Sequence, residues 1–133
     1  MKKDLIINAI REIGYNPQID DDGDIFFRFQ MKIIFIMSSN DDEDKYASAL
    51  LPQFAEVDEE NVLLNLAACN KVTRETKMAK VFIDQTLKNI SASCEFFFTD
   101  EDSLKTNLIH SLNILAMIRT VYNNTLTEFS QEQ

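Results

Sequence analysis

The sequence predicts an α+β fold in which helices pack on a twisted antiparallel sheet, in the order α-β-β-β-(β)-α-β-β-α. Apolar residues recur at helical spacing near the start, in the middle and near the end of the chain. Between these segments lie short runs of aromatic and β-branched residues bounded by Asp, Asn and Gly. With 133 residues, 45% of them hydrophobic, we expect a single domain over residues 1–124 and a polar tail over residues 125–133.

A helix is predicted over residues 4–13, where Ile6, Ala9 and Ile10 share a face and Gly14 offers a left-handed cap. The run DDDGD that follows could be a calcium loop or a turn. With Gly23 at the sixth position of a calcium loop, Gln18 and Phe29 fall at the first and twelfth positions, where carboxylates are needed. The flanking residues are also typical of strands, so we predict a hairpin between strands over residues 15–20 and 24–30.

A third strand is predicted over residues 32–38. It is apolar on both faces, which predicts a central strand that is covered on both sides or pressed against a partner. The acidic run at residues 38–45 is interpreted as a solvated loop rather than a metal site or a patch for a basic partner. Residues 46–53 could form a strand or an irregular segment, and Pro52 interrupts either one; we favour an edge strand.

In the second half, Asp58 is the expected N-cap of a helix that ends near Lys71. Two strands are predicted over residues 78–84 and 90–98. Thr99 and Asp102 have capping-box spacing, which predicts a last helix over residues 100–123. The expected apolar stripe of the middle helix consists of Val62, Leu63, Leu66 and Cys69.

The last helix changes character halfway along its length. Its first half has a polar face that includes His110, opposite a leucine stripe. In the second half, four apolar residues extend that polar face: Ile114, Met117, Ile118 and Val121. Either the rest of the domain covers them or a second chain does, and we select these four residues as the candidate partner or dimer contact.

The formal net charge of −9 argues against nucleic acid or anionic membranes as partners and favours a basic one. The alternative explanation is that the excess of acidic residues serves only to keep the protein soluble. The start of the chain is too polar for a secretory signal, and no apolar run is long enough to span a membrane, so a cytoplasmic protein is expected.

The sequence predicts no enzyme, no cofactor and no metal site. His110 is the single histidine and falls on a polar helix flank, where a solvated role is expected. Cys69 and Cys94 lack neighbouring Cys or His residues at ligand spacing, which favours buried, reduced thiols. Gly14 and Gly23 stand alone, so no phosphate-binding loop is indicated.

The chain resembles the YbjN family of bacterial proteins, which shares its fold with the type III secretion chaperones. Four segments carry the resemblance: DDDGDIFFRF, KIIFIM, LLNLAACNK and KMAKVFID. The resemblance covers roughly residues 2–123 and rests on patterns of apolar and turn residues. It implies an α+β sandwich and a homodimer, and it brings no catalytic residues.

Together these features predict a non-enzymatic protein-binding module, chaperone-like or regulatory, that is dimeric and takes a basic or amphipathic protein client. An inhibitor or immunity-type protein that binds a basic partner is the alternative. A metal-binding or enzymatic domain is the third possibility.

Overall fold

The computed structural model describes residues 1–132, which form three helices and six strands in the predicted order. The elements are α1 (Lys2–Glu12), β1 (Gln18–Ile19), β2 (Ile25–Phe29), β3 (Lys32–Met37), β4 (Tyr46–Glu56), α2 (Val62–Glu75), β5 (Ala79–Ile83), β6 (Asn89–Phe97) and α3 (Glu101–Gln131). The strands make one antiparallel sheet in the order β1-β2-β3-β4-β6-β5. The predicted α+β class and element order are confirmed.

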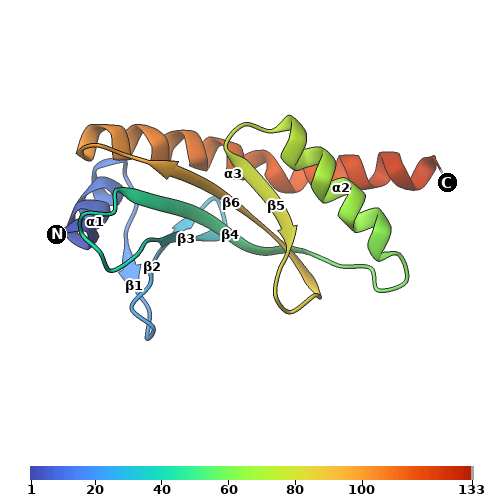
Figure 1. The fold of residues 1–133 in the computed structure, drawn as a ribbon, viewed down its shortest axis with the longest axis horizontal. Coiled ribbons are helices and arrows are strands. Elements are labelled where there is room, and N and C mark those ends of the chain that lie inside the picture. The colour runs from blue at the N-terminus through green and yellow to red at the C-terminus, as the bar shows by residue number, and fades with distance from the viewer. Residues whose placement is uncertain (133) are drawn as a thin grey trace.

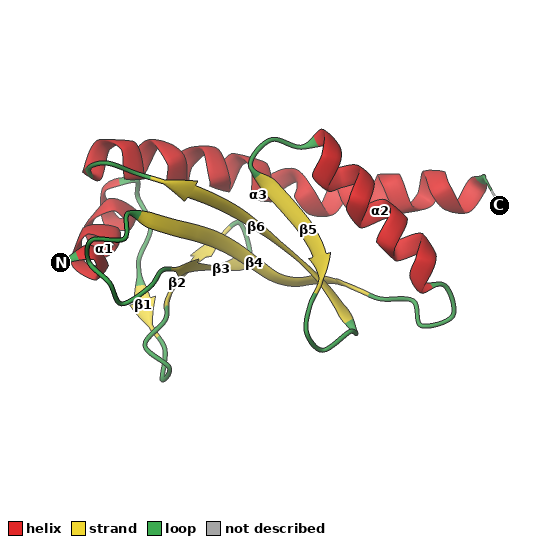
Figure 2. Cartoon of the chain, in the orientation of Figure 1, coloured by secondary structure: helices red, strands yellow, loops and turns green. Residues whose placement is uncertain are grey.

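The helices lie together on one face of the sheet (Figure 2). In Figure 1, α3 runs the length of the molecule, α1 lies near one end of it and α2 crosses it near the other. The two ends of the chain therefore lie at opposite ends of the molecule (Figure 1). Within residues 1–132, no helix covers the opposite face of the sheet.

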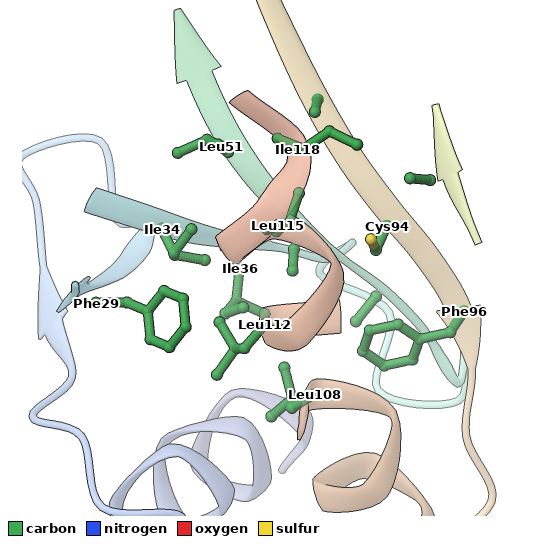
Figure 3. Close-up of a cluster of buried hydrophobic side chains, with 14 of the residues drawn as sticks. Phe29, Ile34, Ile36, Leu51, Cys94, Phe96, Leu108, Leu112, Leu115 and Ile118 are labelled. Atoms are coloured by element: carbon green, nitrogen blue, oxygen red, sulfur yellow. The ribbon is translucent and has the colours of Figure 1, made fainter. Parts of the chain in front are cut away.

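The core lies between the inner face of the sheet and an apolar stripe of α3. Alternate residues of each strand point inward, because successive strand side chains point to opposite faces. Leu108, Leu112, Leu115 and Ile118 of α3 project into this layer and are buried (Figure 3). Burial of a side chain of this size stabilises the fold by about 1.5–3 kcal/mol.

The aspartate run forms a turn, as predicted. β1 and β2 pair antiparallel through Gln18 with Phe26 and through Ile19 with Ile25. One carboxylate oxygen of Asp20 accepts hydrogen bonds from the backbone N–H groups of Asp22 and Asp24, at 3.0 and 2.8 Å. Strands flank the loop on both sides where a helix-loop-helix calcium site would need helices.

The assignment of residues 46–53 to an edge strand is wrong. β4 has 11 residues and lies inside the sheet, between β3 and β6. Pro52 is tolerated because the register of β4 against β6 shifts between Leu51 and Ala55, which takes the proline out of the ladder. Gln53, in this irregular stretch, has a positive φ of 49°.

The start and the buried face of α2 also differ from the prediction. The N-cap is Asn61 and not Asp58, and the helix ends at Glu75, beyond Lys71. Of the predicted stripe only Cys69 is buried, and Leu63 and Leu66 are exposed. The face that packs inward consists of Asn65, Ala68, Cys69 and Val72.

A buried hydrogen-bond network turns the asparagine of α2 inward. Asn65 donates through Nδ2 to the hydroxyl of Tyr122 at 2.7 Å, and its Oδ1 accepts the backbone N–H of Asp58 at 2.9 Å. Burial raises the pKa of Tyr122 to about 12, although the hydrogen bond from Asn65 acts in the opposite direction. This network joins α2, the loop before it and α3, so the partner that decides the orientation of α2 lies 57 residues away in sequence.

α3 begins and ends differently from the prediction. Its N-cap is Asp100, in a capping box with Ser103, rather than Thr99 with Asp102. The helix continues past Asn123 to Gln131 because Thr125 is buried and Phe129 packs against the core. The predicted polar tail is therefore helical as far as Gln131, and residue 133 lies outside the described residues.

We predict that Tyr122→Phe lowers the free energy of unfolding by about 1–3 kcal/mol, because it leaves the buried Asn65 amide without an acceptor. Urea denaturation monitored by circular dichroism measures the loss. Tyr15→Phe is the matched control, since the Tyr15 ring packs on Phe27 and Phe29 and is only half-buried. Equal losses in the two variants would show that the Asn65–Tyr122 hydrogen bond contributes nothing specific.

Candidate interaction surfaces

The structure places the four predicted partner residues of α3 in different environments. Ile118 is 1% exposed and belongs to the core (Figure 3), whereas Met117 is 63% exposed. Ile114 and Val121 are half-buried and pack against the core. All four line a shallow groove of about 390 Å³ between α3 and the turn that connects α2 to β5. Contact of this groove with a partner stays a prediction.

We predict that Ile118→Ala lowers the free energy of unfolding by about 2–5 kcal/mol, because it leaves a cavity in the core. The neighbouring change Met117→Ala, at an exposed site, is expected to stay within about 0.5 kcal/mol of the parent protein. Chemical denaturation of the two variants checks both values. A large loss at Met117 would show that this side chain is covered in solution.

A second surface is the face of the sheet that the helices leave open, here called the outer sheet face. It is formed by the strand residues that alternate with the core residues. They are Gln18, Phe26, Arg28, Ile33, Phe35, Met37, Tyr46, Ser48, Leu50, Glu56, Lys80, Phe82, Asn89, Ser91, Ser93, Glu95 and Phe97. An antiparallel sheet with one solvated face normally carries polar residues there, but β3 presents Ile33, Phe35 and Met37.

Aromatic rings pair across neighbouring strands of this face. The ring centroids of Phe26 and Phe35 are 5.6 Å apart, and those of Tyr46 and Phe97 are 5.4 Å apart. The Phe97 side chain is 76% exposed, so most of a large aromatic ring is accessible to solvent. An exposed apolar patch of this kind is a typical mark of an interaction site.

A polar network lies within the outer sheet face. Glu95 accepts hydrogen bonds from the hydroxyl of Tyr46 and from the ammonium of Lys80. The bond from Lys80, followed by that from Tyr46, holds the pKa of Glu95 below its usual range. Burial, together with the bond to Glu95, raises the pKa of Tyr46 to about 12. The Glu95 carboxylate is thus neutralised by a cation on the neighbouring edge strand.

Sequence reasoning selected α3 and did not select this face as a site. The sequence nevertheless indicated this face. The strand predicted over residues 32–38 is apolar on both faces, and such a strand was expected to be covered on both sides or pressed against a partner. The helices cover one of these faces. Contact of the other face with a partner stays a prediction.

The acidic loop at residues 38–45 surrounds a cation of the chain itself. Lys2 is buried, and its ammonium donates to the hydroxyl of Ser39 and to the carbonyl oxygens of Asp41 and Asp44, at 3.1, 2.8 and 2.9 Å. The backbone N–H of Lys2 donates to a carboxylate oxygen of Asp42 at 3.1 Å. The loop is therefore a structural cap on the start of α1.

The two acidic loops lie side by side. Asp22 and Asp24 of the hairpin and Asp42 of the later loop line one polar pocket of about 330 Å³, together with Lys2 and Lys3. Asp20, Asp22 and Asp24 also offer carboxylate oxygens within 4.8 Å of one another. Exposed acidic groups commonly gather without an ion, and the Asp20 carboxylate already accepts two backbone hydrogen bonds.

We predict that Lys2→Met lowers the free energy of unfolding by about 1–3 kcal/mol and speeds amide exchange in residues 39–44, because three acceptors lose their donor. Lys3→Met removes one exposed hydrogen bond, to the carbonyl of Gly23, and is the control. Hydrogen exchange with mass spectrometry reads the loop directly. Unchanged exchange in Lys2→Met would mean that the loop is ordered by other contacts.

The remaining candidate reactive groups are dispersed. His110 is exposed on α3. Burial raises the pKa of the Cys69 and Cys94 thiols to about 11, which keeps both protonated near neutral pH. Both are free cysteines, as predicted.

None of the helices in the described part of the chain is both long enough and apolar enough to cross a membrane.

Comparison with known proteins identifies the fold. No family model and no curated protein matches the sequence. Among solved structures, the chain is similar to the crystal structure of YbjN from E. coli, which is described as a proposed transcription regulator. The TM-score is 0.69 with 13% sequence identity, and the match covers 92% of this chain and 91% of that one. The chain therefore has a YbjN-like fold, as its sequence patterns indicated.

Proposed function

We propose that the protein is a non-enzymatic protein-binding module that acts as a homodimer. The observation that carries the proposal is the aromatic-rich outer sheet face, which the helices of residues 1–132 leave uncovered. The side chains that could do chemistry support a binding role over catalysis, since His110 stands exposed and the thiols are buried and protonated.

A second copy of the chain fits this face on electrostatic grounds. Two chains with a formal net charge of −9 each repel one another wherever their carboxylates meet. On the outer sheet face, Arg28 and Lys80 are balanced against Glu56 and Glu95, so this face carries no net negative charge. Two copies that meet through this face bury its exposed apolar side chains.

The dimer is expected to depend on Phe97. Light scattering coupled to size-exclusion chromatography is expected to give a dimer for the parent protein and a monomer for Phe97→Glu, which puts a charge into the apolar contact. Leu63→Glu is the matched control, because Leu63 on α2 is 77% exposed and Phe97 76%. A monomeric parent protein, or equal effects of the two variants, would refute pairing through the outer sheet face.

For the role of such a dimer, we propose chaperone-like or regulatory binding of a protein client. The regulatory version draws on the description of YbjN as a proposed transcription regulator. With its acidic surface, this chain is expected to regulate through protein contacts and not by binding DNA itself. The α3 groove around Met117 is the second surface available to a client.

An inhibitor or immunity-type role is the second candidate. It is favoured by the two acidic loops, distant in sequence, that meet around the same polar pocket. Binding of a basic protein there would weaken steeply with added salt, whereas pairing through the outer sheet face would not. A monomer that captures a basic protein in a salt-sensitive manner would favour this second role.

A further inference from the structure

The sheet splits between β3 and β4. The two strands pair only from Phe35 to Met37 with Ser48 to Leu50, whereas the start of β3 pairs with β2 alone. Beyond Leu51, β4 pairs with β6 alone. Figure 3 shows β4 leaving the direction of β3 as it passes Leu51. Two strand edges therefore face each other without a shared ladder.

A cleft of about 500 Å³ occupies this split, here called the sheet cleft. Its lining residues come from β3, from the irregular part of β4 and from α3, and they are Lys32, Ile33, Phe35, Leu51, Pro52, Gln53, Phe54 and Arg119. Phe54 is half-buried and held by an edge-on contact with the Tyr122 ring, at 5.6 Å between centroids. The apolar wall is thus fixed in place by the core.

The charge of the sheet cleft is opposite to that of the whole chain. Lys32 and Arg119 line the cleft, and no Asp or Glu does. Within residues 1–132, neither cation makes an ion pair, and the ammonium of Lys32 reaches only the carbonyl oxygen of Gln30, at 3.4 Å. In a chain with 22 acidic and 13 basic residues, two unpaired cations at an apolar cleft favour an anionic ligand.

We propose that the sheet cleft binds an extended peptide segment that carries an apolar side chain next to carboxylates. The apolar side chain fits the wall formed by Ile33, Pro52 and Phe54, and the carboxylates pair with Lys32 and Arg119. An extended backbone suits the site because the facing edges of β3 and β4 offer unpaired ladder positions. The ligand is a protein segment of acidic character, in contrast to the basic client that net charge alone favours.

This inference rests on the proposed protein-binding function. The sheet cleft adjoins the dimer contact and shares Ile33 and Phe35 with the outer sheet face. The dimer assay reads Phe97, which does not line the sheet cleft. A monomeric protein would therefore refute the pairing and leave the peptide site intact. Failure of the peptide test would likewise leave the dimer result unaffected.

The test is selection from a displayed random peptide library on the immobilised full chain. We expect the selected peptides to be enriched in Asp or Glu beside aromatic or branched aliphatic residues. Binding of a selected peptide, measured by fluorescence anisotropy, is expected to weaken at least about tenfold in Lys32→Glu/Arg119→Glu. The neutral pair Lys32→Gln/Arg119→Gln is the second variant, and it should weaken binding in the same direction.

The matched control is Arg74→Glu/Lys88→Glu, which makes the same change in net charge at two exposed positions away from the sheet cleft. Binding by this control should stay close to that of the parent protein. Hydrogen exchange should slow in residues 32–35 and 51–54 when the peptide is bound. Selection of basic peptides, selection of none above an empty surface, or equal binding by the test and control variants would overturn the proposal.

Discussion

The structure depends on the burial of one face of the sheet against α3. With 31 residues, α3 is about 46 Å long at 1.5 Å per residue, and it packs against β4, β5 and β6. Its stripe from Leu104 to Tyr122 meets the inward side chains of the strands. Because α1 and α2 lie beside α3 on the same side of the sheet, all three helices of residues 1–132 leave the opposite face of the sheet uncovered.

Much of this arrangement could be predicted from local patterns. The Asp22-Gly23 turn, the strand KIIFIM and the leucine spacing of α3 each specify an element through neighbours close in sequence. The predictions are wrong where a residue distant in sequence determines the local structure. Asn65 is buried because Tyr122 receives its hydrogen bond, and no pattern within α2 contains that information. Pro52 likewise looked incompatible with a central strand until the register shift of β4 accommodated it.

The candidate surfaces were predicted less well than the fold, for a physical reason. The apolar residues of α3 were recognised by their helical spacing, but periodicity does not reveal that Ile118 points into the core while Met117 points out. The two apolar faces of β3 were recognised too, and the unknown was which face the helices would take. No sequence pattern indicated the sheet cleft, because Lys32 and Arg119 are 87 positions apart and only the fold brings them to the same cleft.

The connections of the sheet store strain. Gln30 and Met31, which join β2 to β3, have φ values of 48° and 65°, and Gln53, Met78 and Leu87 are also left-handed. Each such residue costs of order 1 kcal/mol where glycine or asparagine would be relaxed. Two of the five, Met31 and Gln53, adjoin the two strand segments that diverge. These two strained residues flank the gap between β3 and β4, at the place where the proposed peptide would add its backbone to the sheet.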